Sequence, residues 1–127
     1  MPNPAASRLR AHVQMLAGTI GERNLWRCEA LDRAARYVVA QFSNGGYAPE
    51  LQTFDVAKIP VSNVEATLTG AARAAEIVVV GAHYDTVAGC PGANDNGTGV
   101  AAVMELAQRF SGRPQPRTIR FVAFVNE

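Results

Sequence analysis

The chain has 127 residues, a length that predicts one domain with a buried core. Hydrophobic residues make up 48% of it and charged residues 18%, which is typical of a globular protein and excludes a disordered one. The formal net charge of +1 gives no field that would attract nucleic acid or anionic lipid. No signal peptide or apolar run of ~18 residues is present, so we expect a cytoplasmic protein without nucleic-acid or membrane partners.

Two helices are expected in the first part of the chain. Residues 7–17 place Leu9, Val13 and Leu16 on one helical face. Residues 29–42 show a longer apolar stripe at helical spacing, and the Gly45–Gly46 pair is a natural stop for it. The chain's cysteines lack a CxxC spacing, so we expect free thiols.

The apolar period then changes to two over residues 51–69. Val64, Ala66 and Leu68 alternate with polar residues. This alternation predicts an antiparallel strand pair with one solvated face, joined by a turn that contains Pro60.

Residues 76–127 predict a βαβ unit. The run "EIVVVGA" (76–82) and the segment "TIRFVAFVNE" (118–127) are expected to be strands buried on both faces, which is typical of a parallel sheet. An amphipathic helix over 98–110 would connect them by a right-handed crossover. The sequence therefore belongs to the α/β class and shows no internal repeat or domain linker.

Four polar residues follow the ends of these strands. His83 and Asp85 come just after the first, Asp95 lies on the glycine-rich loop before the helix, and Glu127 ends the second. Ligands of open α/β sheets bind beyond the carboxyl ends of the strands. An imidazole and a carboxylate meeting there are plausible zinc ligands, and Asp85 is placed to orient the imidazole.

Each of these residues also has an ordinary structural interpretation. A single histidine after a strand is more often hydrogen-bonded than metal-bound. The loop "ANDNGTG" alone predicts an Asx-rich turn with Thr98 as the helix N-cap. Glu127 alone would be a solvated side chain. The agreement of spacing and topology on one edge of the sheet favours the metal site.

Three ordered motifs carry a more specific resemblance. "VVVGAHYDTV", "GCPGANDNGTGVAAVMELA" and "RTIRFVAFVNE" together resemble the co-catalytic zinc aminopeptidases of metallopeptidase family twenty-eight. That family includes leucyl-type aminopeptidases and the glutamate carboxypeptidase II branch. The resemblance runs from about Glu76 onwards and implies a three-layer α/β/α fold with a mixed, largely parallel sheet.

The resemblance also implies roles for the four polar residues. His83 matches the first zinc ligand, and Asp95 matches the aspartate that bridges two zinc ions. Asp85 matches the carboxylate behind the histidine, and Glu127 matches the general base. The peptide bond after Asp95 is expected to be cis, as it is in that family.

The same resemblance implies further zinc ligands, including a second glutamate after Glu127, that these residues do not contain. We therefore expect the N-terminal part of a catalytic domain, nearly inactive by itself, with an exposed sheet edge that could self-associate. The function implied is removal of N-terminal residues from peptides. A relative resembling glutaminyl cyclase or a carboxypeptidase, or a non-catalytic binding module, remains an alternative.

Overall fold

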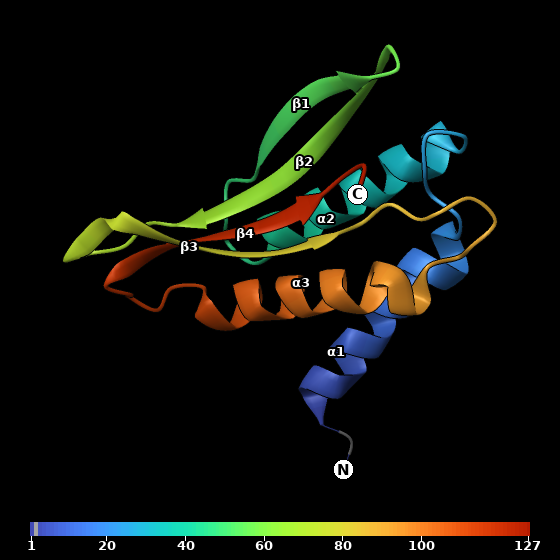
Figure 1. The fold of residues 1–127 in the computed structure, drawn as a ribbon. Coiled ribbons are helices and arrows are strands. Elements are labelled where there is room, and N and C mark those ends of the chain that lie inside the picture. The colour runs from blue at the N-terminus through green and yellow to red at the C-terminus, as the bar shows by residue number, and fades with distance from the viewer. Residues whose placement is uncertain (2) are drawn as a thin grey trace.

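The structure is a computed structural model that describes residues 1 and 3–127. Figure 1 shows the order of its elements along the chain. They are α1 (Pro4–Val13), the π-helical η1 (Gln14–Ile20), α2 (Cys28–Asn44), β1 (Glu50–Val56), β2 (Ile59–Leu68), β3 (Arg73–His83), the kinked turn η2 (Ala93–Gly97), α3 (Thr98–Phe110) and β4 (Arg117–Phe124).

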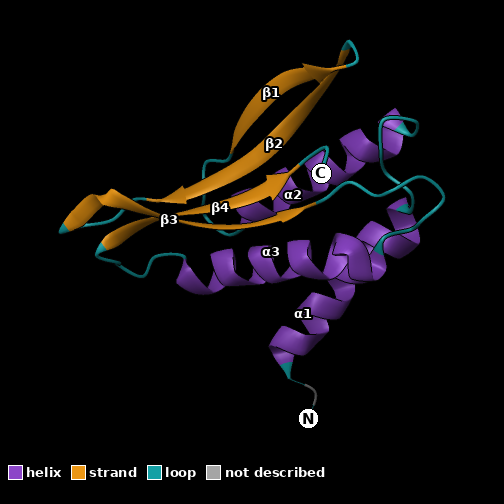
Figure 2. Cartoon of the chain, viewed as in Figure 1, coloured by secondary structure: helices purple, strands orange, loops and turns teal. Residues whose placement is uncertain are grey.

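The strands form one mixed sheet in the order β1-β2-β4-β3. β2 pairs antiparallel with β1 and β4, whereas β3 pairs parallel with β4. Figure 2 shows the helices on one side of this sheet. The expected α/β class and mixed sheet are confirmed. Among the described residues two of the three strand pairings are antiparallel and the helices form one layer, so this part of the sheet is not largely parallel.

The core lies between that helical layer and the sheet. Directly paired residues of neighbouring strands point to the same face of the sheet. Val64 pairs with Ala123, and Ala66 pairs with Phe121, so these side chains of β2 and β4 lie together on the face that the helices cover. The apolar stripes of α2 and α3 pack against this face. The buried members from the helices are Leu31, Ala34, Val38, Phe42, Val100, Val103, Met104 and Ala107.

The helices extend beyond the predicted ranges. The predicted 7–17 helix begins at Pro4, where Asn3 accepts a hydrogen bond from the Ala5 N–H, and it changes to π-helical hydrogen bonding after Val13. The predicted 29–42 helix covers Cys28–Asn44 and ends at Gly45. His12 on α1 is buried, and its Nδ1 lies within hydrogen-bond distance of the Tyr37 hydroxyl.

The predicted strand pair is confirmed, but its turn is not where Pro60 suggested. Ala57 and Lys58 form the turn with positive φ values, and Pro60 lies inside β2 opposite Asp55. Proline is tolerated there because β1 and the start of β2 form the margin of the sheet.

The expectation that β3 is buried on both faces is wrong. Its residues Ile77, Val78 and Val79 are 47%, 44% and 56% exposed. Among the described residues β3 is an edge strand that pairs with β4 alone, and helix α3 covers one of its faces. β4 lies between two strands, and most of its second half is buried as predicted.

No helix among the described residues is long and apolar enough to cross a membrane.

Candidate metal centre

The predicted site residues gather where β3 and β4 end. Because these two strands are parallel, their carboxyl ends lie at the same edge of the sheet (Figure 1). His83 is the last residue of β3 and pairs with Phe124, the last residue of β4. The chain then enters the loop that carries Asp95 and leads into α3. The topology therefore brings both loops to one point, as the βαβ pattern predicts.

His83 lies between the two aspartates. Its Nε2 is 3.0 Å from Asp95 Oδ1. Its Nδ1 is 3.1 Å from the main-chain oxygen of Asp85 and 3.4 Å from the Asp85 carboxylate. The expectation that the side chains of His83 and Asp95 meet at this edge is confirmed, and their binding of an ion stays a prediction. On the far side of the ring, the shorter contact is to the Asp85 main chain rather than to its carboxylate.

The loop around Asp95 has an unusual backbone. The Asp95–Asn96 peptide bond is cis, as expected from the resemblance. Asn96 Oδ1 accepts a hydrogen bond from the Gly99 N–H and so satisfies a donor at the start of α3. Thr98, the expected N-cap, instead donates its hydroxyl hydrogen to the Asn94 carbonyl oxygen. Asn96 therefore has the capping role that the sequence suggested for Thr98.

Glu127 reaches the same edge through its main chain. Its N–H points at the Asp85 carboxylate, with N···O distances of 3.3 and 3.4 Å. Its side chain is exposed. Asp85 is thus placed between the end of β3 and the segment after β4.

The residues present fit part of a zinc site. A histidine nitrogen and a carboxylate oxygen are donors that zinc accepts at about 2.0–2.2 Å, so two tetrahedral ligands of one ion lie about 3.3–3.6 Å apart. The 3.0 Å contact between His83 Nε2 and Asp95 Oδ1 is shorter than that spacing by a few tenths of an ångström. Within residues 1 and 3–127, no group of three or more His, Cys, Asp or Glu side chains is placed to hold one ion.

Sequence reasoning missed Arg23, which is fully buried beside the site. In the sequence it is one of many scattered arginines, and neither helical nor strand periodicity marks it. Burial lowers the pKa of its guanidinium, and the charge of Asp85 opposes that effect. Its side-chain donors all contact main-chain carbonyl oxygens, those of Leu16, Gly21, Tyr84, Pro91 and Gly92.

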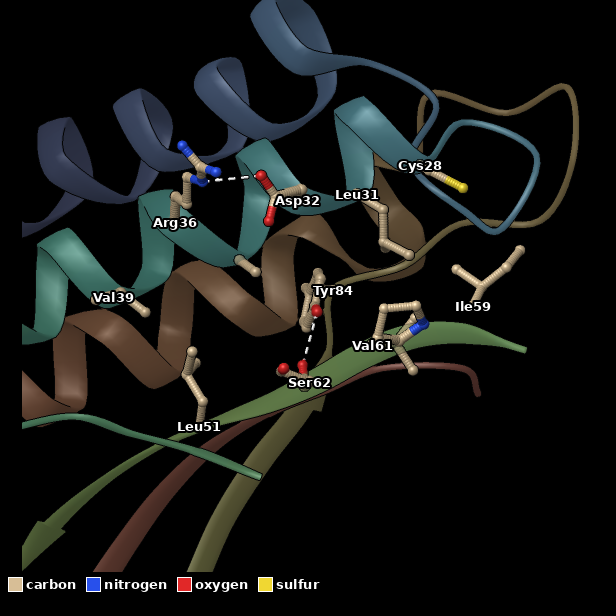
Figure 3. Close-up of a pocket in the computed structure, with 12 residues that line it drawn as sticks. Cys28, Leu31, Asp32, Arg36, Val39, Leu51, Ile59, Val61, Ser62 and Tyr84 are labelled. Carbon is tan, nitrogen blue, oxygen red and sulfur yellow. Dashed lines mark hydrogen bonds and ion pairs between the residues drawn. The ribbon is translucent and has the colours of Figure 1, made fainter. Parts of the chain in front are cut away.

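A cavity of about 310 Å³ lies apart from this centre, between α2 and the β1–β2 hairpin (Figure 3). Leu31, Val39 and Leu51 contribute to its apolar wall, and Tyr84 donates a hydrogen bond to the Ser62 carbonyl oxygen at its floor. Burial raises the pKa of the Tyr84 hydroxyl. His83, Asp95 and Glu127 do not line this cavity, so it is separate from the candidate metal centre.

Comparisons with known proteins find similar sequences and similar folds. Over 49 residues the chain is 49% identical to aminopeptidase YwaD of Bacillus subtilis, a match that covers 39% of this chain and 11% of that protein. Its fold resembles BSAP, a zinc aminopeptidase from Bacillus subtilis, with a TM-score of 0.83 and 15% identity over 98% of this chain and 62% of that one. It also resembles Fimbriiglobus ruber glutaminyl cyclase, with a TM-score of 0.80 and 23% identity over 100% of this chain and 47% of that one.

The chain spans less than two thirds of each of these relatives. At such low identity the two structural likenesses show the fold, which the aminopeptidase and the cyclase share. Residues 63–127 match peptidase family M28, and this half of the chain holds His83, Asp85, Asp95 and Glu127. The chain belongs to peptidase family M28.

Proposed function

We propose that this chain is part of a zinc-dependent aminopeptidase, which removes N-terminal residues from peptides. The observation that carries the proposal is the 3.0 Å approach of His83 Nε2 to Asp95 Oδ1, where β3 and β4 end. Family membership and the similarity to aminopeptidase YwaD support this choice of reaction.

Four side chains would take part in zinc binding and peptide hydrolysis. His83 would bind zinc through Nε2, and Asp95 would bind through its carboxylate, bridging two ions. Asp85, on the far side of the imidazole, would hold the His83 ring in position. Bound zinc supplies a Lewis acid that polarises the scissile carbonyl and acidifies water.

Glu127 would be the general base. A carboxylate at this edge of the sheet can accept a proton from the attacking water and return it to the leaving amine. The contact of its N–H with Asp85 supports this role, because it holds the main chain of Glu127 near His83.

His83 and Asp95 by themselves give each zinc ion too few ligands. A catalytic zinc usually has three protein ligands and one open position. We therefore propose that residues outside this chain contribute the remaining ligands, and that the 127-residue chain alone hydrolyses peptides slowly or not at all.

The test uses the full natural protein and a chromogenic leucyl substrate. Activity should disappear with a chelator and return with zinc. We expect Asp95→Asn and His83→Ala to abolish both the activity and most of the zinc binding. The matched control is Asp55→Asn, which changes an exposed carboxylate on β1 and should leave both unchanged. Full activity in zinc-free Asp95→Asn protein would exclude the proposal.

A second set of substrates separates the alternatives on the same fold. A peptide with N-terminal glutamine reports cyclisation, and a peptide with a blocked N-terminus reports carboxypeptidase activity. The similarity to glutaminyl cyclase structures makes the first of these the main competitor. Cyclisation without release of leucine would assign the cyclase reaction to the same zinc ligands. Zinc binding without turnover of any substrate would favour a non-catalytic binding module.

A further inference from the structure

Arg23 places a buried cation between the two loops that carry the proposed ligands. Its relative exposure is 0%, although it lies on the short connection between η1 and α2. Guanidinium stays charged in proteins, and a buried charge is costly unless its donors find acceptors. The acceptors of its hydrogen bonds therefore show which segments of the chain Arg23 connects.

The guanidinium contacts both loops at once. Arg23 Nε donates to the Tyr84 carbonyl oxygen at 2.5 Å, and that carbonyl lies between His83 and Asp85 in the chain. On the other side, Nη1 donates to Pro91 O at 2.7 Å and Nη2 donates to Gly92 O at 3.0 Å. One planar group thus joins the end of β3 to the loop that leads to Asp95.

Main-chain contacts of the same segment reinforce this connection. The Arg23 N–H donates to Thr86 Oγ1 at 3.1 Å, and the Thr86 N–H donates to Arg23 O at 2.8 Å. Glu22 accepts a hydrogen bond from the Gly89 N–H at 3.0 Å. Residues 22–23 therefore contact the β3–α3 loop along its first half.

The connection continues to the turn that presents Asp95. Gly92 O accepts a second hydrogen bond, from the Gly97 N–H at 3.0 Å. Asp95 lies inside the turn that this bond closes. A shift of the Arg23 guanidinium would therefore move both Gly92 and the position of Asp95 relative to His83.

We propose that Arg23 is a positioning residue that sets the separation of His83 and Asp95 through the Tyr84, Pro91 and Gly92 carbonyls. The inference rests on the proposed function of His83 and Asp95 as zinc ligands. Lysine cannot replace Arg23, because a single ammonium group lacks the planar set of five donors needed to reach both loops.

The experiment compares Arg23→Lys with Arg33→Lys, an exposed arginine on α2, in the full natural protein. Hydrogen exchange of the metal-free protein reports the mobility of residues 84–97. Zinc titration reports affinity, and the absorption spectrum of the cobalt-loaded protein reports ligand geometry. All are measured where urea titration shows each variant to be folded. In Arg23→Lys we expect faster exchange in this segment, about 10-fold weaker zinc binding and a changed cobalt spectrum.

A purely structural role gives a different result. A folded Arg23→Lys protein with lower stability but unchanged zinc affinity and cobalt spectrum would overturn the inference. If this variant does not fold, Gly92→Ala decides, because a Cβ there would overlap the Thr86 side chain and displace the carbonyl that accepts from Arg23 Nη2. A weaker zinc affinity and a shifted cobalt spectrum in Gly92→Ala, but not in Gly89→Ala, support positioning, and unchanged values overturn it.

The failure of the proposed function can be recognised separately. If His83→Ala does not change zinc binding, the proposed function is wrong, and the positioning role is overturned with it. If zinc binding depends on His83 but not on Arg23 or Gly92, the inference alone is wrong.

Discussion

The role of Glu127, general base or zinc ligand, can be determined by measuring zinc binding and turnover separately. As a general base it contributes to the rate, so Glu127→Gln should lower kcat by roughly 10²–10⁴-fold and change zinc affinity by less than about 3-fold. Exposed Glu50→Gln on β1 is the control and should change neither quantity. Calorimetric zinc titration and steady-state kinetics of the full natural protein measure both. A large loss of zinc affinity in Glu127→Gln would make Glu127 a ligand instead.

Glu105 is a buried carboxylate whose importance comes from ion pairs rather than from the metal centre. Arg8 donates to both of its oxygens at 2.8 Å, and Arg109 donates at 2.9 Å. The hydrogen bonds from Arg8 are the largest cause that lowers the pKa of Glu105 to about 2; burial opposes them and Arg109 adds to them. The pair with Arg8 joins α1 to α3, whereas Arg109 lies one turn further along α3 itself.

The lowered pKa predicts how stability changes in acid. The carboxylate is favoured in the folded state, so its contribution is complete above the unfolded pKa of 4.5 and is lost as pH falls towards 2. At pH 7, Glu105→Gln should lower the free energy of unfolding by about 2 kcal/mol, since Arg8 remains partly solvated. Urea unfolding at pH 7, 4 and 2.5 measures this difference, with Glu50→Gln as the control. A difference between wild type and variant that does not shrink in acid would contradict the assignment.

At the scale of elements, two glycines in the β3–α3 loop form a matched pair. Gly89 and Gly92 have φ values of +81° and +62°, so alanine is strained at either position. A Cβ at Gly89 would meet nothing within 4 Å. A Cβ at Gly92 would overlap the Thr86 side chain and lie 2.7 Å from the Asp95 carbonyl oxygen.

Alanine variants of the two glycines distinguish the cost of backbone strain, which both share, from the cost of steric overlap at Gly92. Gly89→Ala should cost about 1 kcal/mol of stability, while Gly92→Ala should cost about 2 kcal/mol more because the loop must move. We expect Gly92→Ala alone to weaken zinc binding as well, since it displaces the main chain of Asp95. Urea unfolding and zinc titration of both variants check this. Equal losses in the two variants would show that crowding at Gly92 has no role.

The elements also show which patterns could be predicted from the sequence. The helical stripe that ends at Phe42 and the alternation of Val64 with Glu65 depend on local burial, and both predictions are confirmed. The apolar run of β3 also predicted a strand, but its exposure depends on which neighbours the sheet provides. Local periodicity carries no information about those neighbours.

The residues of the candidate site also fall into those that the sequence predicted and those that it did not. His83 and Asp95 were predicted because motif spacing and strand ends are properties of the sequence. Arg23 was missed because its acceptors are main-chain carbonyls, which any residue supplies. The burial of His12, away from the site, could not be predicted either, because it depends on the packing of α1 and on the contact with Tyr37.

At the scale of the whole molecule, we propose that the exposed edge of β3 is a surface for self-association. Its apolar residues are about half exposed, and an unpaired strand edge offers main-chain hydrogen bonds to another strand. We expect the 127-residue chain to associate as its concentration rises. Val79→Lys should weaken this association about 10-fold, because a charge would enter the contact. Sedimentation velocity over a concentration series measures the effect.

Val87→Lys is the matched control for that prediction. Val87 is 67% exposed, but it lies in the loop after β3 and outside any strand. Equal dissociation by the two lysine variants would show that net charge rather than the β3 edge governs association. Sedimentation without concentration dependence in the wild type would remove the edge as an interface.

The central place of β4 has a consequence for synthesis on the ribosome. β4 lies between β2 and β3, yet it is translated after both. The β1–β2 hairpin is local and can form early, but the sheet cannot close until Phe124 has left the exit tunnel. Until then the nascent chain presents two strand edges and the uncovered apolar faces of α2 and α3. Chaperones that bind extended apolar segments at the ribosome are therefore expected to engage it until β4 emerges.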